Sequence, residues 1–275
     1  MKRLVSAFLA GAMALSLAAC GGAASTSTVA SSASASGSAA ASETAASDLD
    51  YIKEKGKMVI GYTVYEPMNY TDADGNFTGF DTELATAVCE KLGVEPEFVE
   101  INWDTKVVEL DAKSIDCIWN GMTLTDDIMA NAATTKAYAK NAQVVVVKDG
   151  TDYSSTADLA GKTIAVQTGT TAEEYCMDNG YSVLSFASNN DAQAALTSGK
   201  ADAWVVDNEA AARMAADQSL TVLDEAMTSE PYAFAFAKGS SLVDQVNTAL
   251  QELLQDGTVE KLFQEYDTVY VSPLS

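Results

Sequence analysis

Short apolar runs and helical spacings of apolar residues alternate along the chain from residue 48 onward. Runs of this kind predict buried strands, and apolar positions three or four residues apart predict helices packed against them. The first predicted elements are a strand, helix, strand, helix and strand at Lys57–Tyr62, Asp81–Leu92, Glu97–Ile101, Trp103–Ala112 and Ile115–Trp119. Asp81 is the expected N-cap of the first helix and Gly93 its C-cap. This order predicts a parallel sheet with helices on its faces.

The same order begins again after residue 142. The predicted strands are Gln143–Val147, Lys162–Gln167, Ser182–Phe186 and Ala203–Val206, helices begin at Ala172 and Asp191, and two amphipathic helices follow at Leu242–Gln255 and Val259–Tyr266. The extended runs Gln143–Val147 and Tyr232–Ala237 bracket this second unit, so we interpret them as two crossover strands between lobes. Lobe 1 then comprises 48–142 plus 234–275, and lobe 2 comprises 143–233. Two such lobes face each other across a cleft, where small ligands usually bind.

The first 47 residues have the pattern of an exported lipoprotein. Lys2 and Arg3 precede an apolar run that is too short for a permanent membrane span, and residues 1–20 are the predicted signal peptide. The run ends in Leu-Ala-Ala before Cys20, the expected site of lipidation. Residues 21–47 are almost entirely Ala, Ser, Thr and Gly, which predicts a disordered tether reaching roughly 30 Å. We expect an extracytoplasmic protein held at the cell membrane by its lipid alone.

The composition excludes several classes of function. The formal net charge is −23, so binding to nucleic acid is not expected. The chain has no histidine, the commonest general base and metal ligand, and we expect neither a metal nor a cofactor. Cys89, Cys117 and Cys176 have no metal-ligand spacing and are interpreted as buried apolar residues, although a Cys89–Cys117 disulfide is an alternative.

Several segments together resemble one protein family. They are Ile60–Tyr62, Tyr65–Met68, Gly75–Leu84, Ile115–Thr125, Asp158–Lys162, Val166–Thr171 and Gly199–Asp207. In this order and at this spacing they resemble the polar amino-acid (family 3) solute-binding proteins of ABC importers. The resemblance implies an α/β, two-lobed periplasmic-binding-protein-like fold (type II) that closes around one small polar solute. It implies an ABC permease with its ATPase as partners, and a monomeric receptor.

The resemblance also implies roles for individual residues. Tyr65 and Trp103 would cover the ligand side chain with aromatic rings, and Asp207 would pair with a ligand ammonium. The loop after the third strand would contact the ligand through Asn120, Gly121 and Thr123. The start of a lobe 2 helix, at Thr170 and Thr171, would receive the ligand carboxylate. Ile128 and Trp119 are further candidates for the pocket lining.

Ile128 departs from the family pattern. The family usually places an arginine three residues after the threonine that is Thr125 here, and that arginine clamps the ligand carboxylate. Isoleucine offers neither charge nor donor, and Arg213 lies elsewhere in the chain. We therefore expect a ligand whose carboxylate is absent, modified or held differently, and weak binding of ordinary amino acids.

Two other functions remain as alternatives. Some relatives on this fold are dehydratases, which need an acid/base pair in the cleft; Asp207 and Glu66 are the obvious carboxylates here, but no paired motif is visible. A sensor for a membrane kinase would carry a transmembrane helix after the lobes, so a sensor here would be a lipoprotein that signals through a partner. Binding without catalysis is the preferred hypothesis.

Overall fold

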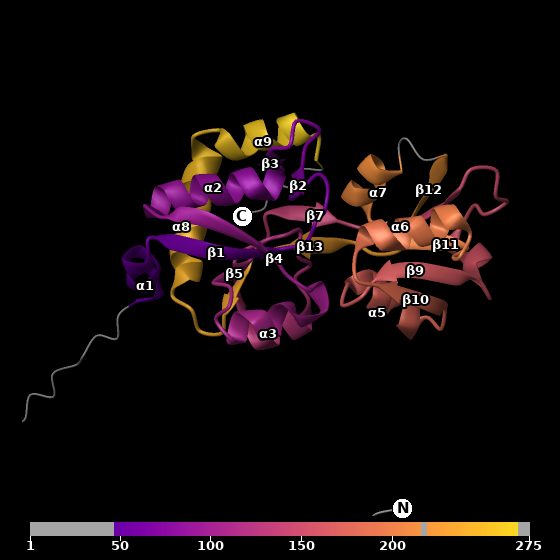
Figure 1. Cartoon of the computed structure of the whole chain (residues 1–275), viewed down its shortest axis with the longest axis horizontal. Helices are drawn as coiled ribbons and strands as arrows, with labels where there is room; N and C mark the ends of the chain where they lie inside the picture. Colours follow the sequence, from indigo (N-terminus) through magenta and orange to yellow (C-terminus); the bar gives the residue numbers. More distant parts are fainter. Residues whose placement is uncertain (1–46, 216–218, 269–275) are drawn as a thin grey trace, which may run out of the picture. The chain divides into compact units, whose positions relative to one another are not determined.

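The computed structural model describes residues 47–215 and 219–268 (Figure 1). The predicted signal peptide, Cys20 and all but the last residue of the predicted tether lie outside these residues. Ser47, the last residue assigned to the tether, belongs to the folded part: its side chain accepts from the backbone N–H of Asp50, and Asp50 caps Ser47 in return. This capping box begins the first helix, α1 (Asp48–Lys55).

The first sheet has the strand order β4-β1-β5-β14-β6. Its strands are β1 (Lys57–Tyr62), β4 (Glu95–Glu100), β5 (Cys117–Ile118), β6 (Ala132–Thr134) and β14 (Ala235–Ala237). As predicted, β1 is parallel to β4 and β5, whereas β14 runs antiparallel to β5 and β6. Figure 1 shows α2 on one side of β1 and β4 and α3 on the other. Besides α1, the helices of this part of the chain are α2 (Phe80–Leu92), α3 (Lys106–Asp111), α4 (Asp126–Asn131), α8 (Leu242–Gln255) and α9 (Thr258–Tyr266).

The second sheet has the strand order β10-β9-β11-β8-β12. Its strands are β8 (Gln143–Lys148), β9 (Thr163–Gln167), β10 (Ser182–Phe186), β11 (Ala203–Asp207) and β12 (Leu220–Ala226). β9 is parallel to β10 and β11, and β8 is antiparallel to β11 and β12. The accompanying helices are α5 (Thr171–Asp178), α6 (Asn189–Ser198) and α7 (Asn208–Met214). Lobe 1 and lobe 2 hereafter denote the first and the second sheet, each with its helices.

Two small antiparallel pairs complete the fold, together with two 3₁₀ turns. They are β2 (Tyr70–Thr71) with β3 (Phe77–Thr78), β7 (Ala139–Asn141) with β13 (Glu230–Tyr232), and the turns Trp103–Thr105 and Thr156–Leu159. Along the chain, β7 connects β6 of the first sheet to β8 of the second. β13 connects β12 of the second sheet back to β14 of the first. β7 and β13 are therefore the crossover strands.

The predicted crossover strands were assigned mostly to the wrong residues. Gln143–Val147 lies inside the second sheet between β11 and β12, with all five residues buried. The run Tyr232–Ala237 is divided: Tyr232 ends β13, and Ala235–Ala237 is the first-sheet strand β14. The alternative of a Cys89–Cys117 disulfide is also wrong, because both cysteines are free. Cys89, Cys117 and Cys176 are all buried, which confirms the preferred interpretation.

The face of α2 shows how sequence spacing determines packing. Phe80, Leu84 and Val88 are fully buried, and they lie four residues apart on one side of the helix. The helix begins one residue earlier than predicted, with Gly79 in the capping position. Asp81 is therefore not the N-cap; it lies in the first turn, completely buried. Within the described residues, no helix has both the length and the apolar character needed to cross a bilayer.

Candidate ligand-binding site

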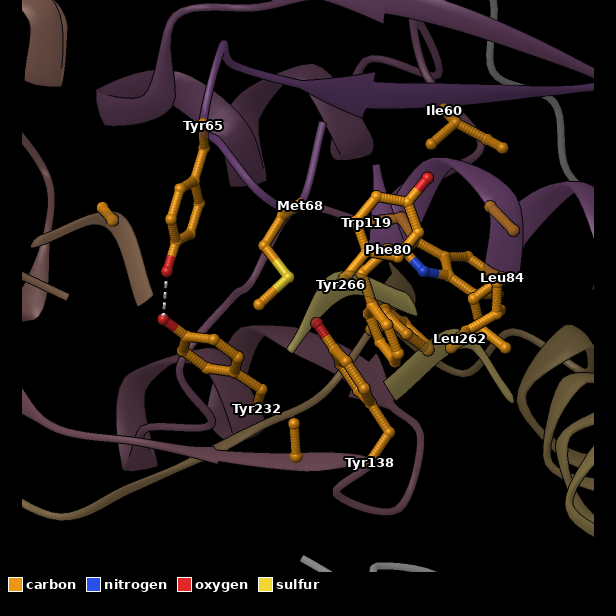
Figure 2. Packing of buried hydrophobic residues seen from close by; sticks show 14 of the residues in the cluster. Ile60, Tyr65, Met68, Phe80, Leu84, Trp119, Tyr138, Tyr232, Leu262 and Tyr266 are labelled. Atoms are coloured by element: carbon orange, nitrogen blue, oxygen red, sulfur yellow. Dashed lines mark hydrogen bonds between the residues drawn. The ribbon is translucent and has the colours of Figure 1, made fainter. Parts of the chain in front are cut away.

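A cavity of about 420 Å³ is lined by residues of both lobes. Its size falls in the usual range for small-molecule sites. Eight ligand-binding residues were predicted, and all of them line it, as does Ile128: Tyr65, Trp103, Asn120, Gly121, Thr123, Thr170, Thr171 and Asp207. Trp119, the other candidate, does not line it. Trp119 is buried and stacks on Phe234 with 3.7 Å between the ring centroids, so it belongs to the core (Figure 2).

The loop after β5 is fixed by hydrogen bonds within lobe 1. The side-chain oxygen of Asn120 accepts from the backbone N–H of Thr63, and its amide donates to the Thr63 carbonyl and to Asn69. The backbone N–H of Gly121 donates to Asp81 at 2.6 Å. Gly121 has a φ of +54°, and a Cβ there would lie 2.6 Å from the Tyr65 ring. Asn120 and Gly121 therefore shape the cavity, while the donors predicted to meet a ligand are engaged by protein groups.

A chain of hydrogen bonds through Tyr232 connects two residues that line the cavity, Tyr65 and Asp207. The hydroxyl oxygens of Tyr65 and Tyr232 lie 2.9 Å apart, as Figure 2 shows. The Tyr232 hydroxyl also donates to Oδ1 of Asp207 at 2.8 Å. Tyr232 was not predicted as a site residue, because in the sequence it is one aromatic among several in an apolar run.

Asp207 lies at the end of β11, with one carboxylate oxygen surrounded by donors. Oδ1 accepts from Tyr232, from Nε2 of Gln143 at 2.9 Å and from Nδ2 of Asn141. No described residue donates to Oδ2, and Asp207 lines the cavity. Burial raises the pKa of Asp207 to about 6, and the nearby charge of Glu230 acts in the same direction. The three donors thus fix the carboxylate through Oδ1, and Oδ2 is left to accept from a ligand cation.

Glu230, on the crossover strand β13, is a site residue that sequence reasoning missed. Its Oε2 accepts from the Thr123 hydroxyl of lobe 1 at 2.8 Å and from the Thr171 hydroxyl of lobe 2 at 3.0 Å. Gln143 donates to the same oxygen at 3.2 Å. The only signal in the sequence was an acidic residue directly before an otherwise apolar extended run.

Thr170 acts as a helix cap. Its hydroxyl donates to the Gln167 carbonyl at 2.7 Å and accepts from the Glu173 backbone N–H at 3.3 Å. This arrangement begins α5 and aims the start of the helix at the cavity. The hydroxyl proton of Thr170 is therefore used in a hydrogen bond within lobe 2, to the Gln167 carbonyl.

The charged residues around the cavity are mostly acidic. Five carboxylates line it: Asp127, Glu173, Glu174, Asp178 and Asp207. Lys106 is the one cation among the described lining residues, and it too was missed from sequence. A cavity with this excess of carboxylates favours solutes that carry positive charge.

The comparisons with known proteins agree with this architecture. Residues 58–268 match the model of the family described as bacterial extracellular solute-binding proteins, family 3. The L-cystine-binding protein TcyJ of Escherichia coli (strain K12) is 30% identical over 79% of this chain and 85% of its own. The arginine-binding extracellular protein ArtP of Bacillus subtilis is 30% identical over 78% and 87%.

A solved structure with a similar fold comes from Streptococcus pneumoniae. It is an ABC uptake transporter substrate-binding protein with bound histidine, 27% identical over 80% of this chain and 95% of its own, with a TM-score of 0.75. The chain belongs to the family 3 extracellular solute-binding proteins, and the predicted two-lobed fold and solute-binding class are confirmed.

Proposed function

We propose that this protein is the extracytoplasmic receptor of an ABC importer and binds an amino acid, or a related amine-bearing solute, between its lobes. The observation that supports this is Asp207, whose Oδ1 is held by three donors while Oδ2 has no described partner. An ammonium against Oδ2 would make a charge-assisted hydrogen bond in a partly desolvated site. The permease and its ATPase are the expected partners, and the receptor acts as a monomer.

Asp207→Asn tests the ammonium site. The asparagine oxygen can still accept from the three donors, but the charge is lost. Calorimetry with L-arginine, L-histidine and L-cystine should show that the best of these binds about 10- to 100-fold more weakly. Asp224→Asn is the control, because it removes the same charge from an exposed position of lobe 2. Equal affinities of parent and Asp207→Asn would place the ligand amine elsewhere.

The same site gives the binding a pH dependence. Since the pKa of Asp207 is about 6, its carboxylate takes up a proton as the pH falls through that value. The proton competes with a ligand cation, so affinity in the parent should fall by about tenfold for each pH unit well below 6. The variant Asp207→Asn should lack this dependence.

Attachment to the membrane through Cys20 is the second part of the proposal. The Leu-Ala-Ala-Cys sequence supports it. Cys20→Ser should move the protein from the membrane fraction of its cells to the soluble or secreted fraction. A variant that still fractionates with membranes like the parent contradicts the anchor.

We also propose that the protein acts by binding alone, as its family does. A bound solute should then be recovered chemically unchanged after prolonged incubation, as measured by mass spectrometry. Turnover would favour the dehydratase alternative.

A further inference from the structure

The hydroxyl protons expected to hold a ligand carboxylate are already used. A hydroxyl has one proton to donate. That of Thr123 goes to Glu230, that of Thr171 goes to the same carboxylate, and that of Thr170 goes to the Gln167 carbonyl. Toward a ligand these oxygens offer lone pairs, which suit an ammonium and repel a carboxylate. With Ile128 in the position of the family arginine, the start of α5 still offers backbone N–H groups to a ligand carboxylate, but a positively charged partner has to come from another element.

Lys106 is a cation placed to serve as that partner. It is the first residue of α3 in lobe 1, it lines the cavity together with Trp103 and Ile128, and it is half-buried. Its Nζ donates to the Trp103 carbonyl at 3.2 Å and, across the cleft, to the Gly169 carbonyl at 2.9 Å. It also lies 4.8 Å from the centre of the Trp103 ring.

The charge of Lys106 is not balanced by an ion pair. No described carboxylate lies within 4.0 Å of its Nζ. An ammonium has three N–H donors, and described residues accept two of them. Burial lowers the pKa of Lys106, the expected effect of removing a cation from water, and the more distant charges of Asp104 and Asp127 oppose that effect. A desolvated cation with a spare donor at the wall of a cavity favours an anionic group on whatever fills that cavity.

We propose that Lys106 binds the carboxylate of a zwitterionic ligand and so replaces the arginine that Ile128 displaces. This inference rests on the proposed function, and it selects one of the three outcomes that Ile128 allows: the carboxylate is held differently. Because Lys106 also contacts Gly169 of lobe 2, the cation is brought into place when the lobes meet. The ligand then lies between two opposite charges, with its ammonium at Asp207 and its carboxylate at Lys106.

Matched pairs of probes separate a carboxylate contact from a general effect on the cleft. L-arginine and agmatine differ by the carboxylate, as do L-histidine and histamine. Their dissociation constants are measured by calorimetry for the parent, Lys106→Met, Lys106→Arg and Lys200→Met. Lys200 is the matched control, because its Nζ also lies over an aromatic ring, that of Phe186 at 5.0 Å, and it does not line the cavity. Thermal melts of each variant establish that it is folded.

The proposal predicts a selective loss. Lys106→Met should weaken the amino acid about 10- to 100-fold more than it weakens the matched amine. Lys106→Arg should restore most of the amino-acid affinity, and Lys200→Met should leave both affinities unchanged.

Three results overturn the proposal. Equal weakening of amino acid and amine would show that Lys106 only joins the lobes, and no weakening would show that it is not used. Amines that bind the parent while amino acids do not would show that the carboxylate is absent from the ligand. If the parent binds none of the probes, the proposed amino-acid class of ligand is wrong. That failure is seen with the parent alone, so it is distinguished from a failure of the role of Lys106.

Discussion

At the scale of single residues, three buried or half-buried carboxylates accept hydrogen bonds from neutral donors. Asp81, Asp207 and Glu230 accept from hydroxyl, amide and backbone N–H groups, and none has a described lysine or arginine within ion-pair distance. Neutral donors stabilise the charge without cancelling it. At Asp207 the remaining negative charge lines the cavity, where a ligand cation can reach it, and Glu230 lies behind the lining residues Thr123 and Thr171.

Asp81 gives a prediction about the dependence of stability on pH. Burial raises the pKa of Asp81 to about 7, above its ordinary value of 3.8, and the bonds from Gly121 and Tyr138 oppose that rise. The folded state therefore binds the proton more tightly than the unfolded state, so stability should fall as the pH rises from about 4 to about 7. Thermal melts at intervals across that window should show the decline.

Asp81→Asn isolates this contribution from the other acidic groups. One asparagine oxygen can still accept from Gly121 and Tyr138, as Oδ2 of Asp81 does at 2.6 and 2.9 Å. The difference in melting temperature, variant minus parent, should rise between pH 5 and pH 7.5. A constant difference would mean that Asp81 has an ordinary pKa in the folded protein.

The sequence predicted which residues line the cavity better than it predicted what they do there. Tyr65, Trp103 and Asp207 line it, because their positions follow from motifs at the ends of strands. The direction in which Thr123 and Thr171 donate depends on Glu230, which is distant from both in sequence. Lys106 was missed for a related reason: three positions after Trp103 it has the pattern of a solvated helical lysine, and its contact with the Gly169 carbonyl comes from lobe 2, far away in the sequence.

At the scale of elements, the strongest sequence signals mark the strands that are buried on both faces. The apolar run of β8 is typical of an interior strand, and it was interpreted as a crossover because its place in the sheet was unknown. The true crossovers, β7 and β13, are three residues long and partly exposed, too short for a periodic signal. The predicted helix Trp103–Ala112 is also divided, because the Asn102 side chain accepts from the Asp104 backbone N–H and favours a 3₁₀ turn first.

The loop between β9 and α5 yields a prediction about contact between the lobes. Gly169 has a φ of +74°, and a Cβ there would lie 2.6 Å from the Cα of Asp104 in lobe 1. Gly169→Ala should therefore keep the lobes apart and weaken the binding of whichever probe the parent binds best. An atom at that distance cannot be accommodated by a side-chain rotation, because the obstacle is backbone.

Gly180→Ala is the matched control for this change. Gly180 has the same φ of +74°, and a Cβ there would have no neighbour within 4 Å. Both substitutions carry the strain of a left-handed alanine, about 1–2 kcal/mol. Melting should show similar losses of stability, while calorimetry should show lost affinity for Gly169→Ala alone. Similar affinities for the two variants would argue against a tight approach of the loop to Asp104.

At the scale of the whole molecule, several contacts between the lobes are polar. Lys106 donates to the Gly169 carbonyl, Arg213 of α7 donates to the Tyr266 carbonyl of α9, and Glu230 accepts from one hydroxyl of each lobe. Polar contacts of this kind exchange readily with water, and each has a net contribution of about 1 kcal/mol. The net charge of −23 opposes them, because like charges on the two lobes repel one another.

This balance predicts that the ligand drives closure. Without ligand, the carboxylates that line the cavity repel one another across the cleft, and two short crossover strands offer little resistance to hinge motion. A ligand that carries positive charge neutralises part of that repulsion and joins the lobes through Asp207 and Lys106. Small-angle scattering of residues 47–275 should therefore give a smaller radius of gyration at saturating L-arginine or L-histidine, whichever binds, than without it. Gly169→Ala should show little contraction under the same conditions, and Gly180→Ala should contract like the parent. A parent whose radius of gyration is unchanged by a ligand that calorimetry shows to be bound would mean that the lobes are already closed when the ligand arrives.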